Sequence, residues 1–165
     1  MYELKAISQD AIPEALSKAE RYRLLHEPGQ AESICQDILR VDANNQAALI
    51  TLLLAITDQF DEGMDAAKAL AIVPRLHGEY ERSYYSGIIS ERRGKGHFKR
   101  GRHGSEAITY ECLVEAMQFY EQASGLRPPG NDDALLRWNT CARFLMEHPG
   151  VQPAAQMRAE PILSE

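Results

Sequence analysis

The sequence predicts an all-α fold of about seven helices. Apolar residues recur at steps of three and four over nearly all 165 positions, which is the spacing of one helix face. No stretch alternates apolar and polar residues for long enough to indicate a β-strand. Proline and glycine fall between the periodic segments, where helices are expected to end.

Helix ends are marked by capping residues and helix breakers. Asp10 is suited to cap the first helix, Ser105 the sixth and Asn131 the seventh, which has two aspartates in its first turn. Pro74 ends the fourth helix early, and "LRPPGND" ends the sixth, because two prolines and a glycine cannot continue a helix. The predicted helices cover residues 10–27, 29–41, 45–59, 62–73, 77–93, 105–125 and 131–147.

A repeat of 34 residues runs through these helices. Ala19, Leu53 and Gly87 are spaced 34 and 34 apart in segments that align with one another. Here the chain resembles the tetratricopeptide repeat (TPR) family, whose unit is a 34-residue helix pair. The matching residues are Ala19, Tyr22, Ala31 and Cys35 in the first repeat and Gly87, Ala116, Tyr120, Ala123 and Pro128 in the third.

This resemblance implies an α-solenoid of about seven antiparallel helices. Its repeats would lie at about 12–45, 46–79 and 80–130, with a half repeat at 131–147 and a flexible C-terminal tail at 148–165. The second repeat departs from the family pattern, with Asp65 where a small residue is expected.

The third repeat contains about 17 extra residues. Ala116 follows Ser90 by 26 residues, against 9 for the equivalent pair of the first repeat. Trp138 follows Gly87 by 51 residues rather than 34. Both spacings exceed the regular repeat by 17 residues. The sequence therefore predicts a basic, glycine-rich loop at about 93–105, inserted between the fifth and sixth helices.

Charge is unevenly distributed along the chain. The segment "RRGKGHFKRGRH", Arg92 to His103, holds 6 of the 18 basic residues and no acidic one, so the remainder has 12 basic and 24 acidic residues, or −12. A polyanion would be repelled elsewhere, which makes this segment the candidate for phosphate or nucleic acid. The candidate loop residues are Arg92, Arg93, Lys95, His97, Phe98, Lys99, Arg100, Arg102 and His103. A solvated loop without a ligand is the alternative.

The TPR resemblance also implies a concave face lined by the first helix of each pair. That face suits a peptide or an amphipathic helix of a partner protein. Its predicted residues are more apolar than an ordinary surface, although internal packing of the same stripe is an equal alternative. They are Leu16, Glu20, Arg23, Ile50, Leu54, Asp58, Tyr84, Ile88, Arg92, Leu135, Asn139 and Arg143. Docking of the chain's own tail in this groove stays open.

No pattern in the sequence indicates catalysis, a cofactor or a metal. The spacings of His97, His103 and Cys112 match no zinc signature, and three cysteines without a C-x-x-C favour a reduced, cytoplasmic setting. We therefore expect a non-catalytic protein-interaction adaptor without membrane contact. Polyanion binding through residues 92–103 and a small chaperone for an apolar client are the alternatives.

Overall fold

The computed structural model describes residues 1–63 and 65–154, apart from the side chain of Glu62. It divides the chain into two compact units, Met1–Gly78 and Glu79–Glu165. The regular elements of the described residues are all helices, without a strand among them, so the all-α prediction is confirmed. The stacking of the two units into one solenoid stays a prediction.

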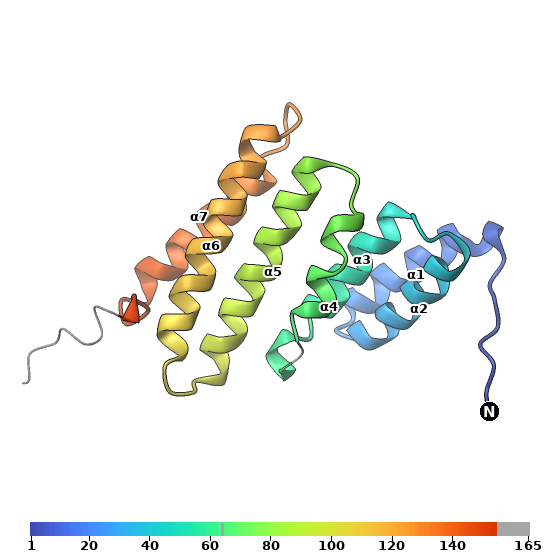
Figure 1. The fold of residues 1–165 in the computed structure, drawn as a ribbon, viewed down its shortest axis with the longest axis horizontal. Coiled ribbons are helices and arrows are strands. Elements are labelled where there is room, and N and C mark those ends of the chain that lie inside the picture. Colours follow the sequence, from blue (N-terminus) through green and yellow to red (C-terminus); the bar gives the residue numbers. More distant parts are fainter. Residues whose placement is uncertain (64, 155–165) are drawn as a thin grey trace, which may run out of the picture. The chain divides into compact units, whose positions relative to one another are not determined.

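The first unit is built on three antiparallel helices that pack in chain order (Figure 1). They are α1 (Ile12–Leu24), preceded by the short 3-10 helix η1 (Gln9–Ala11), α2 (Pro28–Val41) and α3 (Gln46–Thr57). Ile12, Ile38 and Ala48 join the three α-helices in one apolar core. The Asn45 side chain begins α3 by accepting a hydrogen bond from the Ala48 amide at 2.9 Å.

The predicted fourth helix, residues 62–73, is largely wrong. Two 3-10 turns, η2 (Phe60–Glu62) and η3 (Val73–Arg75), flank a helix of only four residues, α4 (Ala67–Leu70). Gly63 adopts a left-handed backbone with φ of 88°, which ends η2. The Asp65 carboxylate then accepts from the Ala67 amide at 3.0 Å, so a new turn begins there.

The second unit consists of α5 (Glu79–Arg100), α6 (Ser105–Leu126) and α7 (Asp133–Glu147), of which α6 packs on both others (Figure 1). The predicted loop at 93–105 is wrong, because α5 continues to Arg100 and only residues 101–104 form the turn. With 22 residues each, α5 and α6 are nine and eight longer than α1 and α2, which have 13 and 14. The 17 extra residues therefore lengthen two helices.

Glycine in α5 allows α6 to approach closely. A Cβ at Gly94 would lie 2.8 Å from the Cys112 Cβ, and one at Gly87 would lie 2.5 Å from the Tyr120 ring. The Thr109 hydroxyl lies 2.7 Å from the Ser105 carbonyl of its own helix and 3.1 Å from the Gly94 carbonyl of α5, so this side chain contacts both backbones. The predicted fifth helix ends too early, at residue 93, because Gly94 was assigned to a loop.

The predicted caps are only partly present. Asp10 lies within η1, and Ala11 precedes α1. Ser105 is the first residue of α6, after Gly104 with φ of 78°. Asn131 does satisfy the start of α7, because its side-chain oxygen accepts from the Asp133 amide at 3.0 Å.

Part of the predicted tail is packed. The His148 ring stacks on Phe144 with a centroid distance of 4.2 Å, and Val151 is buried. Residues 155–165 lie outside the described residues. None of the described helices is long and apolar enough to cross a membrane.

Candidate partner-binding face of helices α6 and α7

In the first unit, two charged residues of the predicted groove bind each other. The Arg23 guanidinium donates through Nε to the Asp58 carboxylate at 2.7 Å, which links α1 to the end of α3. Leu16, Ile50 and Leu54 are half-buried, and Glu20 is exposed. The apolar members of this set therefore serve packing at least as much as they form a surface.

In the second unit, the assignment of Ile88 to the groove is wrong. Ile88 is 1% exposed, so it cannot contact a partner while the unit is folded. Tyr84 is half-buried within a group of tyrosine rings, stacked on Tyr80 at 5.7 Å and edge-on to Tyr85 at 5.1 Å. Arg92 is half-buried on α5. An inward-facing stripe on this helix explains the error, since core and groove residues share the same spacing.

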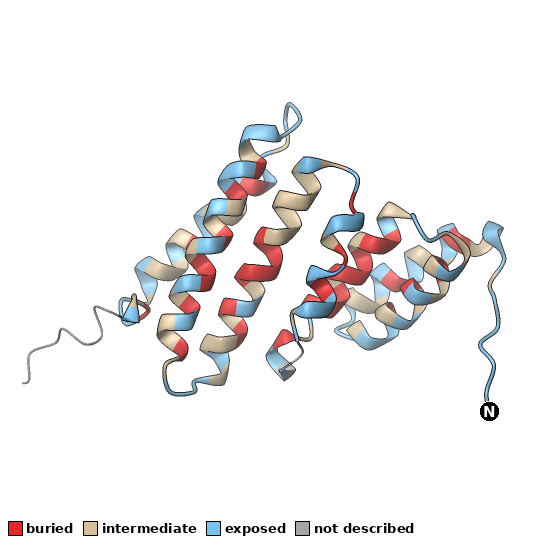
Figure 2. Cartoon of the chain, in the orientation of Figure 1, coloured by how far each residue is buried: buried red, intermediate tan, exposed pale blue. Residues whose placement is uncertain are grey.

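The predicted groove residues on α7 do lie at the surface. Leu135, Asn139 and Arg143 are all exposed at helical steps of four, whereas Ala134 and Cys141 are buried. Figure 2 shows how buried and exposed residues are mixed along the helices of this unit. Two further apolar residues, Leu136 and Met146, lie on this exposed side. They were absent from the predicted groove. The α7 face, as defined here, consists of Leu135, Leu136, Asn139, Arg143 and Met146.

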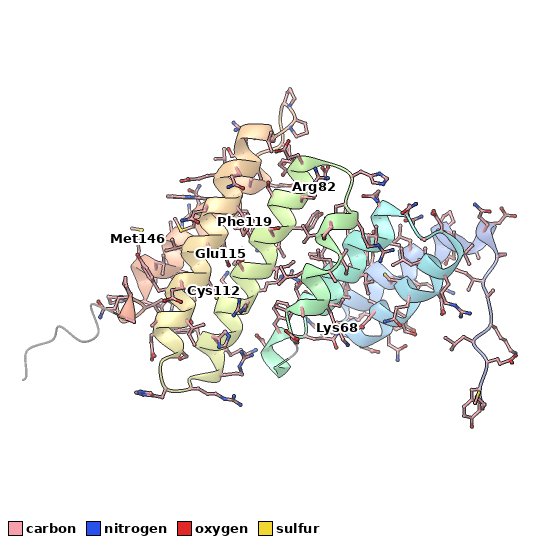
Figure 3. The ribbon with its side chains drawn as sticks, viewed as in Figure 1. Lys68, Arg82, Cys112, Glu115, Phe119 and Met146 are labelled. Carbon is pink, nitrogen blue, oxygen red and sulfur yellow. The ribbon has the colours of Figure 1, made fainter. Side chains whose placement is uncertain are left out.

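Its apolar side chains are unusually open to solvent. Leu136 is 62% exposed and Met146 is 80% exposed. Figure 3 shows Met146 near the end of α7, extending from the ribbon toward solvent. Large apolar side chains gathered on one helix face are typical of a contact surface.

A small pocket adjoins the α7 face. Its volume is ≈ 190 Å³. Trp138 is half-buried, and its indole Nε1–H donates to the Glu121 carboxylate at 3.2 Å. The pocket is lined by Tyr120, Glu121 and Ser124 of α6 and Leu135 and Trp138 of α7.

A buried carboxylate holds the helices that form this pocket. Glu91 of α5 is 1% exposed, and its Oε2 accepts from the Tyr120 hydroxyl at 2.7 Å. Its Oε1 accepts from Lys95 at 2.6 Å and from Arg137 of α7 at 3.4 Å. One side chain therefore connects α5, α6 and α7. The i,i+4 spacing of Glu91 and Lys95 was the only sign of it in the sequence.

The Glu91 cluster is suited to structure rather than to chemistry. Burial and then the neighbouring Glu91 carboxylate raise the pKa of the Tyr120 hydroxyl well above its ordinary value, so the hydroxyl stays protonated and donates. Both carboxylate oxygens are occupied by donors from the same unit. The cluster positions Tyr120 at the pocket and joins α7 to the other helices.

The basic segment is divided between packing and surface. Lys95 is paired with Glu91, and Phe98 packs edge-on against Phe144 at 5.1 Å, so it is not placed to stack on a base. Of the other candidates, Arg92, His97 and Arg100 are half-buried, and Arg93, Lys99, Arg102 and His103 are exposed.

The charges of three arginines act on His97. Burial lowers the pKa of the His97 imidazole, and the nearby positive charges of Arg100, Arg93 and Arg102 lower it further. These four residues form a basic cluster at the C-terminal end of α5 and in the turn after it.

The cysteines are placed in the core. Cys35, Cys112 and Cys141 are buried as free thiols. Burial raises the pKa of the Cys35 and Cys141 thiols to about 12, which keeps them protonated and poorly nucleophilic. Among the residues that the structure describes, no three His, Cys, Asp or Glu side chains are grouped to hold a metal ion.

No protein-family model, curated protein or solved structure matches this chain. The TPR resemblance consequently stays a prediction from the spacing of its residues.

Proposed function

We propose that the chain is a non-catalytic adaptor that binds a segment of a partner protein on the α7 face. The observation that carries the proposal is the exposure of Leu135, Leu136 and Met146 along one helix. A solvated helix face normally carries polar residues at such positions. The pocket beside Leu135 adds a concave feature that a partner side chain can enter.

The test is selection of peptides from a displayed random library against the full chain. We expect enriched peptides with an apolar pattern at helical or extended spacing, because the α7 face is apolar. Their affinity should fall tenfold or more with Leu136→Glu, since the new charge would be desolvated on binding; tenfold corresponds to about 1.4 kcal/mol. Isothermal titration measures the change.

The matched control is Leu24→Glu. Leu24 is 81% exposed on α1 of the first unit, so this variant introduces the same charge at an exposed leucine that is not part of the α7 face. Equal affinity of both variants and the wild type, or no enriched peptide, would contradict the proposal. Binding of unfolded clients without preference for any peptide pattern would instead favour the chaperone alternative.

Polyanion binding is a second candidate because Arg93 and Arg100 of α5 and Arg102 of the following turn put three positive charges near His97, whose pKa they lower. It predicts retention of a single-stranded RNA oligomer that weakens steeply between roughly 50 and 200 mM salt. The triple change of these arginines to alanine should abolish retention. If the triple variant retained the RNA oligomer as well as the wild type does, this candidate would be removed. It would also be removed if the wild type retained no RNA at low salt.

A further inference from the structure

The pocket between α6 and α7 combines an apolar wall with one carboxylate. Leu135 and Trp138 supply apolar surface from α7, and Tyr120 is fully buried, so its ring lies at the inner end. Glu121 is exposed at the rim. The arrangement therefore differs from the rest of the α7 face, which offers apolar contact without an acidic group.

The polar groups of this pocket differ in how many hydrogen bonds they already make within the chain. Ser124 already accepts from the Arg127 guanidinium through both its carbonyl, at 2.8 Å, and its hydroxyl, at 2.9 Å. Arg127 is in turn paired with Asp132 at 3.2 Å. The Glu121 Oε1 accepts from Trp138, and among the described residues its Oε2 receives no hydrogen bond. The acceptor left for a ligand is a carboxylate oxygen.

Size and charge together select the kind of ligand. A volume of ≈ 190 Å³ lies below the roughly 300 Å³ at which pockets for drug-sized ligands begin, so a single side chain fits better than a cofactor. An anion would be repelled by the negative charge of Glu121. A lysine or arginine side chain instead lays its methylene groups on the apolar wall and its charged head beside Glu121. The indole of Trp138 also attracts a cation placed over its face.

We propose that this pocket receives a basic side chain of the partner segment, with Glu121 binding its charged group and Trp138 and Leu135 packing on its stem. This inference rests on the proposed function, because it names the chemistry of one anchor residue in the segment bound by the α7 face.

The experiment uses the full ¹⁵N-labelled chain and follows the indole Nε1–H signal of Trp138, the only tryptophan in the sequence. The probes are the acetylated methylamides of lysine, arginine and norleucine. We expect a saturable shift of this signal with the lysine or arginine probe, with an affinity in the millimolar range that suits one side chain. Norleucine has the apolar stem without the charge, and it should cause no saturable shift.

Glu121→Gln should weaken the lysine or arginine probe fivefold or more while it keeps an oxygen that can accept from Trp138. Glu111→Gln is the matched control, because Glu111 is an exposed glutamate of the same helix outside the pocket lining, and it should leave the affinity unchanged. Equal binding of norleucine, no saturable binding of either basic probe, or an unchanged Glu121→Gln variant would overturn the inference.

Failure here is distinguishable from failure of the proposed function. If selected peptides depend on Leu136 but lack a basic residue and ignore Glu121→Gln, the adaptor proposal holds and the basic anchor does not exist. If basic probes bind while no peptide depends on Leu136, the pocket exists and the α7 face is not the partner site.

Discussion

Replacing Glu91 with alanine is expected to lower the free energy of unfolding of the second unit by about 2–4 kcal/mol. The variant leaves the buried Tyr120 hydroxyl without its acceptor and leaves Lys95 and Arg137 without their shared anion. Both cations keep side chains that are 34% exposed, so water compensates part of the loss and the cost stays below that of fully buried ion pairs.

Urea unfolding followed by Trp138 fluorescence measures this change, because the single tryptophan lies in the second unit. Glu111→Ala is the control, an exposed glutamate whose removal should change the free energy of unfolding by less than about 0.5 kcal/mol. A Glu91→Ala variant as stable as this control would show that the buried carboxylate does not join the three helices.

Gly87→Ala is expected to destabilise the second unit by about 1–3 kcal/mol, although alanine is the better helix former. The added Cβ would lie 2.5 Å from the Tyr120 Cε1 and 2.8 Å from its Cδ1, closer than carbon atoms approach in folded proteins. Tyr120 is 0% exposed, and its hydroxyl is bound to Glu91, so the ring cannot move aside without breaking that bond.

Gly125→Ala gives the matched comparison within the same unit. Gly125 lies in the last turn of α6, and a Cβ there would meet nothing within 4 Å. Its replacement should therefore stabilise by a few tenths of a kcal/mol to about 1 kcal/mol through helix propensity alone. Opposite signs for the two variants in urea unfolding support the close approach of α5 and α6, and the same sign for both contradicts it.

Helical periodicity predicted the class of fold because it depends on local spacing. The 34-residue repeat spacing separately matched Gly87 and Tyr120 to the TPR pattern, and these two residues do meet in the structure. Periodicity alone is less informative. It gave no means to separate core from surface within one stripe, which is why Ile88 was assigned to a groove although it is buried.

The long α5 helix could not be recognised from local propensity. Glycine and a run of like charges both disfavour a helix, so residues 93–100 had the composition of a loop. Contacts with distant residues decide otherwise: Gly94 packs against α6, and Phe98 packs on Phe144 of α7. These two contacts on α6 and α7 are not visible from the segment itself.

The α7 residues of the candidate site were predictable in part. The repeat spacing placed Leu135, Asn139 and Arg143 on one surface, and the structure leaves all three exposed. The pocket was not predictable, because Glu121 and Trp138 are 17 residues apart and are joined only by the packing of α6 on α7.

The most direct test of a partner-binding α7 face is a map of amide shifts in the ¹⁵N-labelled chain on addition of a selected peptide. We predict that the largest changes lie along α7 and the adjoining part of α6, together with the Trp138 indole signal, while α1 and α2 stay unchanged. Changes centred on the first unit, or none at saturating peptide, would contradict the proposal.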